Sequence, residues 1–377
     1  MTMTEMTFAA ALNAGLRDAM SEDAEVLVFG EDVGALGGVF RVTDGLTADF
    51  GEDRCFDTPL AEAGIVGFAV GLAMQGFRPV VELQFDAFGY PAFEQVVSHV
   101  AKMRNRTRGS MPMPLVIRIP YAGGIGGVEH HSDSSEGYYA HTPGLHVFTP
   151  ATPADAYDLL RQAIASDDPV VFMEPKSLYW SRGEVSRSGA EMAEPSAEPM
   201  GRAVGTAAVR RAGADVTIVT YGPQLPTAMQ AAEVAAAEED WNIEVIDLRT
   251  VVPLDDETIM ASVTKTGRCV VLSEAQSFAG VGAELAARIS ERCFHSLAAP
   301  VLRVGGLDIP YPPPKLERHY LPGVDRVLDA VARLQWDDTP DLQHVGTVNA
   351  SNESAPQQPG LRSPLTAGAG LMNGLGW

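Results

Sequence analysis

The sequence is poor in cysteine and in basic residues, and each shortage excludes a class of protein. It has three cysteines in 377 residues and no CxxC spacing, which argues against a disulfide framework or a thiolate metal site. With 27 Lys and Arg against 49 Asp and Glu, the net charge is -22. A nucleic acid or an anionic membrane surface is therefore not an expected partner, whereas a basic protein would suit this charge.

The sequence gives no expectation of a targeting or membrane-spanning segment. The start, MTMTEMTFAA, has neither the basic region nor the long apolar core of a signal peptide. The apolar stretch of residues 58–76 contains Glu62 and several glycines, so a membrane span is not expected there. With reduced thiols as the default, we expect a cytoplasmic protein.

Two common phosphate-binding motifs are missing. The chain has no GxxxxGK[ST] loop and no GDG with a later paired Asn, the pattern that holds a diphosphate through magnesium. The Gly-rich YAGGIGG at residues 121–127 is not a GxGxxG fingerprint opening a helix. A dinucleotide site on this loop is not favoured.

Short apolar strands alternate with helical patterns through most of the chain, which predicts parallel sheets covered by helices on both faces, an α/β fold. Strands are expected at 25–29, 78–85, 115–119, 169–175, 215–221, 244–248, 269–273 and 301–304. Helices are expected at 8–20, 91–102, 227–239, 256–263, 281–293 and 324–334.

Changes of composition divide the chain into four parts. Residues 1–185 form a first α/β domain, and residues 206–335 form a second, smaller doubly wound domain. Between them, residues 186–205 are rich in Ser, Glu and Pro and are expected to be a linker. Residues 336–377 are expected to be a largely disordered tail.

Glu62 is a single carboxylate within the apolar stretch TPLAEAGIVGFAVGLAMQG. A helix that is apolar on every side is expected in the interior, where a carboxyl group must be paired, protonated or in contact with a ligand. A carboxylic acid held near neutrality suits proton transfer. Alternatively, Thr58 and Pro59 start the helix, and Glu62 is only a first-turn charge stabilised by the helix dipole. The glycine spacing at residues 64, 67 and 71 indicates close packing against another helix, either of this chain or across a subunit interface.

Histidines gather in the segment GGVEHHSDSSEGYYAHTPGLHV, which contains His130, His131, His141 and His146. No HExxH or comparable ligand spacing is present, so a zinc site is not favoured. The segment follows YAGGIGG, and a polar loop that leaves a strand end is a usual place for binding chemistry.

Five motifs occur in the same order as in a known protein family. They are GEDVGALGGVFRVTDGL (30–46), DTPLAEAGIVGFAVGLA (57–73), ELQFDAFGYPAFEQ (82–95), HHSDSSEGYYAHTPGL (130–145) and EVIDLRTVVPLD (244–255). Together they closely resemble the β subunit of thiamine-diphosphate-dependent 2-oxo acid dehydrogenases, nearest to the branched-chain enzyme and next to the pyruvate enzyme. The resemblance implies an N-terminal pyrimidine-binding domain, with a parallel sheet flanked by helices, and a transketolase C-terminal-like domain.

The resemblance also implies an activity and partners. The activity is oxidative decarboxylation of branched-chain 2-oxo acids, with acyl transfer to lipoyl groups of an acyltransferase. The assembly is a heterotetramer of two α and two β chains, in which the α subunit supplies the GDG motif, the magnesium and the diphosphate grip. The C-terminal domain would dock the acyltransferase, whose binding domain is commonly basic.

By the same resemblance, Glu62 hydrogen-bonds the aminopyrimidine ring of thiamine diphosphate and exchanges a proton with it. Leu60, Gln84 and Phe88 match positions that line the pyrimidine pocket. Phe88 stands where relatives often carry Tyr, so it can stack but cannot donate a hydrogen bond. Glu31 matches an acidic residue in a chain of carboxylates between two active sites, and a strand-end capping role is equally open.

His131 matches the histidine of an HSQ motif, here His-Ser-Asp, that positions the substrate and assists proton transfer to the lipoyl group. Asp133 replaces the glutamine and is expected to raise the pKa of His131. His130 is expected to be a neighbour rather than a catalyst. Family members can bind potassium in a loop before the PVVF strand, and here the candidate ligands are Asp168 and the carbonyl groups of Ala163 and Ser166.

Other interpretations stay open at this point. Pyruvate is the alternative substrate, because the side chain of the acid would meet residues from both subunits. The chain could instead be a non-catalytic assembly subunit in which Glu62 is only a helix-end charge. A self-sufficient transketolase-like transferase is disfavoured by the missing diphosphate motif.

Overall fold

The computed structural model describes residues 2–187 and 204–334. Most of the linker predicted over 186–205, and all of the tail predicted over 336–377, lie outside these ranges. In the described part of the chain, the strands form a seven-stranded sheet, a five-stranded sheet and a two-stranded ribbon. Among the helices described, we find none with the length and apolar character needed to cross a membrane.

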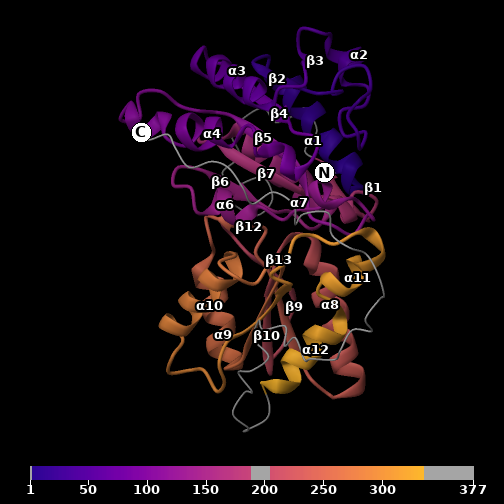
Figure 1. Ribbon diagram of the computed structural model, residues 1–377, viewed down its shortest axis with the longest axis vertical. Helices are drawn as coiled ribbons and strands as arrows, with labels where there is room; N and C mark the ends of the chain where they lie inside the picture. The colour runs from indigo at the N-terminus through magenta and orange to yellow at the C-terminus, as the bar shows by residue number, and fades with distance from the viewer. Residues whose placement is uncertain (1, 188–203, 335–377) are drawn as a thin grey trace, which may run out of the picture. The chain divides into compact units, whose positions relative to one another are not determined.

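The seven-stranded sheet collects most strands of the first half of the chain (Figure 1). Its order is β12-β6-β7-β5-β4-β2-β3, and all neighbours are parallel except β12, which runs antiparallel to β6. Strands β2, β5 and β7 are buried along their whole length, as expected for a parallel sheet covered on both faces. In sheet order the strands span Thr250–Val252, His146–Phe148, Val170–Pro175, Val116–Tyr121, Arg78–Glu82, Val26–Gly30 and Cys55–Asp57.

Helices α1 (Phe8–Glu22) and α7 (Pro153–Ala165) pack against each other. Each begins after a threonine, Thr7 or Thr152, whose hydroxyl accepts a backbone N–H of the first turn at 3.2 Å. The helix predicted at residues 8–20 is confirmed. The other helical segments of this half are α2 (Leu46–Phe50), α3 (Glu62–Met74), η1 (Asp86–Gly89), α5 (Met103–Arg106), η3 (Glu129–His131), α6 (Glu136–Ala140) and η4 (Lys176–Leu178).

The helix predicted over residues 91–102 differs from the structure. A short α4 (Phe93–Gln95) passes into a π-helical turn, η2 (Val96–Val100). In this turn Ala101 N donates to the Val96 carbonyl at 2.9 Å, one residue further back than in an α-helix. A single widened turn of this kind is common near functional sites.

The five-stranded sheet holds the second half of the described chain. Its order is β14-β13-β10-β11-β9, parallel except for β9, which is antiparallel to β11. In sheet order the strands span Leu302–Gly306, Cys269–Gln276, Val216–Thr220, Ile243–Asp247 and Ala208–Arg211. Helices α8 and α12 contact each other, as do α9 and α10, and Figure 1 shows these pairs on opposite sides of the sheet. The helical segments are η5 (Gly222–Gln224), α8 (Leu225–Glu238), α9 (Asp256–Thr266), α10 (Val281–Arg292), η6 (Pro314–Leu316), α11 (Glu317–Tyr320) and α12 (Val324–Arg333).

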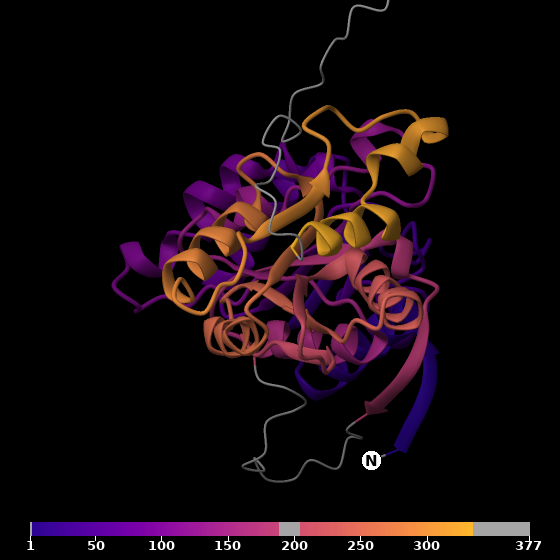
Figure 2. The same ribbon diagram turned by 90° about the horizontal axis from the view of Figure 1, so that it is seen from below.

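The two-stranded ribbon consists of β1 (Thr2–Thr7) and β8 (Arg182–Arg187), which run side by side in Figure 2. The pairing is antiparallel, with Thr7 opposite Arg182. It joins the first strand of the described chain to the strand that ends the first half.

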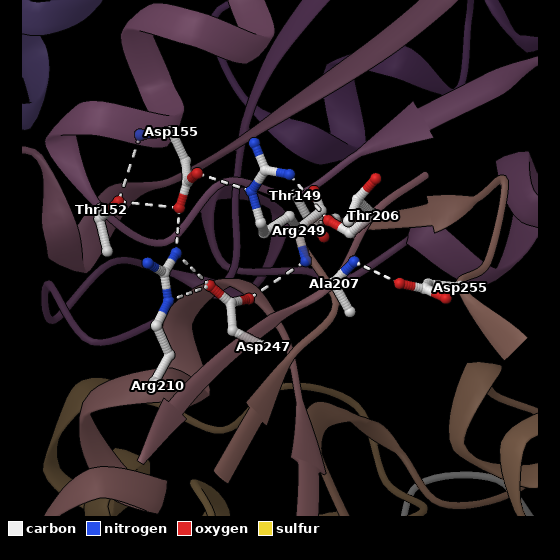
Figure 3. Close-up of polar contacts among 9 residues, drawn as sticks. All are labelled: Thr149, Thr152, Asp155, Thr206, Ala207, Arg210, Asp247, Arg249 and Asp255. Atoms are coloured by element: carbon white, nitrogen blue, oxygen red, sulfur yellow. Dashed lines mark hydrogen bonds and ion pairs between the residues drawn. The ribbon is translucent and has the colours of Figure 1, made fainter. Parts of the chain in front are cut away.

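A buried polar cluster joins α7 to the second half (Figure 3). Asp155 accepts from Arg249 Nε at 2.6 Å and also from Arg210. Asp247 accepts from Arg210 Nη2 at 2.8 Å and from the backbone N of Arg249 at 3.1 Å. Arg249 donates from Nη1 to the Thr206 carbonyl at 2.7 Å. These bonds fix the segment that leads into β12.

Candidate active site

The predicted site residues follow neighbouring strands of the seven-stranded sheet. Because β2, β3, β4 and β5 are parallel, their carboxyl ends lie at one edge of the sheet, where α/β proteins bind ligands. Glu31 follows β2, and Glu62 begins α3 after β3. Gln84 and Phe88 follow β4, and His131 lies in the loop after β5. The topology therefore brings these residues, far apart in the sequence, to a common edge.

Glu31 is a buried carboxyl group with an unsatisfied oxygen. It is 7% exposed, and its Oε1 has no hydrogen-bond partner among the described residues. Burial, followed by the charges of Glu62 and Asp32, raises the pKa of Glu31. Beside it, Gln84 Nε2 donates to Asp32 Oδ2 at 2.9 Å and to the Glu31 carbonyl at 3.5 Å. A buried carboxyl oxygen without a partner can be satisfied by a polar ligand.

Glu62 is half-buried, and α3 is not enclosed by this chain. One face of the helix is buried through Ile65 and Val66, but Phe68 is 52% exposed and Leu60, just before the helix, is 80% exposed. The prediction that this helix is buried on every side is therefore wrong for the described chain. An apolar composition indicates burial, but it does not distinguish a domain core from a surface that a second chain covers.

The glycines of α3 show the same open face. An added Cβ on Gly71 would meet nothing within 4 Å, and one on Gly64 would meet only the nearby Ala61 Cβ, at 3.6 Å. At Gly67 it would meet the side chain of Gln95, at 3.5 Å. Within the described residues, the glycines of α3 therefore pack closely against another helix only at Gly67, next to Gln95 of α4. The helix starts at Glu62, so this carboxylate does lie in the first turn, where the helix dipole favours it.

His131 lies among aromatic rings. Its ring centroid is 4.1 Å from that of Phe85, 5.4 Å from that of Phe88 and 4.5 Å from that of His130. Its Nδ1 is buried with no hydrogen-bond partner in the described ranges. Burial, followed by the charges of His130 and Lys176, lowers the pKa of His131. The imidazole is therefore mainly neutral at neutral pH and has a nitrogen available to accept a proton.

The prediction that Asp133 raises the pKa of His131 is wrong. Asp133 accepts a hydrogen bond from the Tyr90 hydroxyl at 2.7 Å, and burial is the leading cause of the lowered pKa of His131. Two residues of separation in a loop do not determine whether side chains face each other, so the sequence could not decide this point.

A buried ionisable cluster next to the His131 loop was not anticipated from the sequence. Asp86 is fully buried and accepts from the backbone N and the hydroxyl of Ser135 at 3.0 and 2.5 Å; burial raises the pKa of Asp86 to about 7. Lys176 is also fully buried, and burial lowers its pKa to about 8. Glu136 accepts from the Tyr221 hydroxyl of the second half at 2.8 Å. The sequence does contain one indication of this cluster, because Lys176 is a charged residue directly after an apolar strand.

The groups considered for potassium are engaged by other partners. The Ser166 carbonyl accepts from Arg78 Nη1 at 3.0 Å, and Asp168 accepts from Arg104 Nη1 at 2.6 Å. The Ala163 carbonyl accepts from Ser166 N at 3.2 Å. Over residues 2–187 and 204–334, no group of three or more His, Cys, Asp or Glu side chains could hold a metal ion. The potassium site stays a prediction without structural support.

Comparison with known proteins defines the class. Residues 4–181 match the family model of the transketolase pyrimidine binding domain, and residues 205–327 match that of the transketolase C-terminal domain. A solved chain described as a split gene transketolase, inactive β4 tetramer, has a TM-score of 0.67 at 22% identity, covering 87% of this chain and 98% of its own. The predicted α/β fold class is confirmed, and the chain has the two domains of the thiamine-dependent transketolase-like proteins.

Sequence relatives narrow the class to a family. A 3-methyl-2-oxobutanoate dehydrogenase subunit beta from Mycobacterium tuberculosis is 57% identical over 329 residues, covering 87% of this chain and 92% of the relative. A pyruvate dehydrogenase E1 component subunit beta from Leifsonia xyli subsp. xyli is 54% identical over 323 residues, covering 86% and 93%. The corresponding subunit from Staphylococcus epidermidis is 46% identical over 335 residues, covering 89% and 100%. The chain belongs to the β subunits of the thiamine-diphosphate-dependent 2-oxo acid dehydrogenases.

The residues at the sheet edge fit the pyrimidine end of that cofactor. An aminopyrimidine ring needs partners for its nitrogens and a flat apolar contact for its face. Glu31 has an unpartnered oxygen and Glu62, half-buried, has its charge close enough to raise the pKa of Glu31; the Gln84 amide lies next to Glu31, with its Nε2 bonded to Asp32 and to the Glu31 carbonyl. Phe88 supplies a half-buried ring, which also contacts His131.

Proposed function

We propose that this chain, together with an α subunit, oxidatively decarboxylates branched-chain 2-oxo acids and transfers the acyl group to lipoyl groups of an acyltransferase. The observation that carries the proposal is the carboxyl pair of Glu62, at the start of α3, and Glu31, buried with an unpartnered oxygen. The 57% identity with the M. tuberculosis subunit supports branched-chain substrates. The 54% identity with the L. xyli subunit keeps pyruvate as the second candidate.

The chain's own residues would hold the pyrimidine ring of thiamine diphosphate and exchange a proton with it. Glu62 would be the exchanging carboxyl group, and Glu31 would lie beside it in the chain of carboxylates; burial raises the pKa of Glu31 and so favours its protonated form. Gln84, Leu60 and Phe88 line the ring. When bound, the cofactor supplies the electron sink that decarboxylation requires.

His131 would act in the acyl transfer step. Its lowered pKa leaves the imidazole neutral at neutral pH, so it can take up a proton at a ring nitrogen. Phe85 and Phe88 contact the ring and restrict its orientations. This arrangement suits a residue that positions the substrate and moves one proton.

The proposed assembly contains two α and two β subunits, with magnesium and the diphosphate held by α. The apolar surface of α3, with Leu60 and Phe68 exposed, supports a contact with another chain. The net charge of -22 suits a basic docking domain of the acyltransferase. We propose a cytoplasmic location. A potassium ion at Ala163, Ser166 and Asp168 would have to displace the hydrogen bonds that these groups now accept.

Glu62→Gln in the reconstituted α–β complex tests the proposal. Glutamine keeps the size of the side chain but cannot exchange a proton, so turnover should fall about 10²–10⁴-fold while assembly is retained. Glu52→Gln is the matched control, because Glu52 is an exposed acid of the same half. The chain alone should decarboxylate nothing.

A near-normal rate for Glu62→Gln would favour the assembly subunit, in which Glu62 is only a helix-end charge. Comparing kcat/KM for 2-oxoisovalerate, 2-oxoisocaproate and pyruvate decides the substrate. A clear preference for pyruvate would replace the branched-chain assignment and leave the proton-exchange role intact.

A further inference from the structure

The glycine-rich segment that leads to His131 forms a closed loop. Ala122 N donates to the Asp133 carbonyl at 2.7 Å, which ties the beginning of the loop to its end. Inside the loop, His131 N donates to the Val128 carbonyl at 2.9 Å. The position of His131 therefore depends on the contacts that hold residues 123–127.

Two carboxylates from the second half of the chain hold this loop by its backbone. Glu274 of β13, 5% exposed, accepts from Gly123 N at 2.6 Å. Glu317, the first residue of α11, accepts with its Oε1 from Gly124 N at 3.0 Å and from Gly126 N at 3.2 Å. Three backbone N–H groups of the loop are thus bound by two side chains of the second half, and these three bonds restrain the loop.

The fit between the loop and the second half is close. The Tyr311 hydroxyl donates to the same Oε1 of Glu317 at 2.6 Å and so fixes that carboxylate. A Cβ added to Gly123 would lie 1.9 Å from the Tyr311 hydroxyl oxygen, and Gly124 adopts a φ of +85°. Glycine is required at both positions, the first for close approach and the second for its backbone conformation.

On the basis of the proposed function, we infer that Glu317 and Glu274 are positioning residues for acyl transfer to the lipoyl group. They hold the glycine loop so that His131 faces the reacting groups. Glu62 and Glu31 follow β3 and β2, which are far from this loop in the sequence. Within the described residues, neither Glu274 nor Glu317 forms a hydrogen bond with Glu62 or Glu31. Loss of the restraint should therefore affect acyl transfer more than decarboxylation.

The test uses Glu317→Ala and Glu317→Gln in the full-length chain, reconstituted with its α subunit. Glu291→Gln is the control, because Glu291 is exposed on α10 of the same half. Two rates are measured: decarboxylation with an artificial electron acceptor, and acylation of a lipoyl domain. Glu317→Ala should lower the second rate by about tenfold to a hundredfold, as expected when a reacting group is misplaced by about 1 Å, and should leave the first nearly unchanged. Glu317→Gln keeps an acceptor oxygen and should recover part of the loss.

A second measurement does not depend on activity. Hydrogen–deuterium exchange of the full-length chain should show faster exchange of the Gly123–Gly126 amides in Glu317→Ala and unchanged exchange in α10. Equal loss of both rates, loss of neither, or unchanged exchange in the loop would each overturn the inference. Failure of the unsubstituted complex to decarboxylate any 2-oxo acid would count against the proposed function instead, and the exchange data would still decide whether Glu317 restrains the loop.

Discussion

Replacing Arg118 with methionine measures how strongly one buried ion pair network stabilises the seven-stranded sheet. Arg118 of β5 is fully buried between Glu82 of β4 and Glu174 of β7. Its Nε and Nη2 donate to Glu174 at 2.6 and 2.9 Å, and its Nη1 donates to Glu82 at 2.7 Å. The Tyr179 hydroxyl adds a bond to Glu174 at 2.7 Å. One guanidinium thus balances two carboxylates in the interior.

Arg118→Met leaves both carboxylates buried without their cation. Removing one partner of a buried ion pair costs about 3–5 kcal/mol. Three charge-assisted hydrogen bonds are lost here, so the upper part of that range, about 4–5 kcal/mol, is expected. In a domain of this size each kcal/mol lowers the melting temperature by about 2–4 °C, which predicts a decrease of about 8–20 °C.

The loss should depend on pH. Burial raises the pKa of Glu82 even with Arg118 present, and the uncompensated charge of Glu174 should raise it further in the variant. The folded variant then holds a proton that the unfolded chain releases above about pH 4, so its stability falls as the pH rises. The deficit should be smaller at pH 5 than at pH 8.

Differential scanning calorimetry at both pH values provides the assay. The control is Arg182→Met, because Arg182 is exposed and its ion pair with Glu5 spans 3.5 Å. Such a pair contributes at most about 1 kcal/mol. If Arg118→Met lost no more thermal stability than Arg182→Met at pH 8, the reasoning about the buried network would be refuted.

The remaining predictions concern the His131 loop and its buried acids. Gly123→Ala places a methyl group 1.9 Å from the Tyr311 hydroxyl and should lower the free energy of unfolding in urea by about 1–3 kcal/mol. The control Gly71→Ala has open space around the new methyl group and should not destabilise the chain. Equal urea midpoints for the two variants would contradict the close fit at Gly123. Burial raises the pKa values of Asp86 and Glu274 to about 7, so the folded state retains protons that the unfolded chain loses above about pH 4. The free energy of unfolding should therefore fall as the pH rises from about 4 to 7, and Asp86→Asn should make it depend less on pH. If urea unfolding gave the same slope of this free energy against pH for the variant, Asp86 would be ionised in the folded state.

Most of the fold could be predicted from local patterns. Runs such as residues 169–175 are apolar at nearly every position, which occurs in strands buried on both faces, and the helix at residues 8–20 has clear periodicity. The π-helical turn at Val96–Val100 could not be predicted, because it depends on one additional residue accommodated by neighbouring packing rather than on a sequence signal.

The candidate site was predictable only in part. The order of the strands explains why Glu31, Glu62 and Gln84 meet at one edge, since each follows a parallel strand. The environment of each group was harder to predict. The exposure of α3 depends on whether a second chain covers it, and the pKa of His131 depends on rings and charges brought close by tertiary structure. Lys176 shows the same difficulty, because its burial follows from packing between distant segments.

Strand β12 has a consequence for how the two halves fold. It comes from residues 250–252, after the third strand of the later half, yet it pairs with β6 at the border of the earlier half's sheet. The stretches recognised as two family domains, 4–181 and 205–327, are therefore not separate hydrogen-bonded units. A fragment that stopped at residue 187 would keep β7 beside β6 but would lack β12, so one border of β6 would be unpaired, which invites association with other chains. Expression of either half alone should yield an incomplete, aggregation-prone protein.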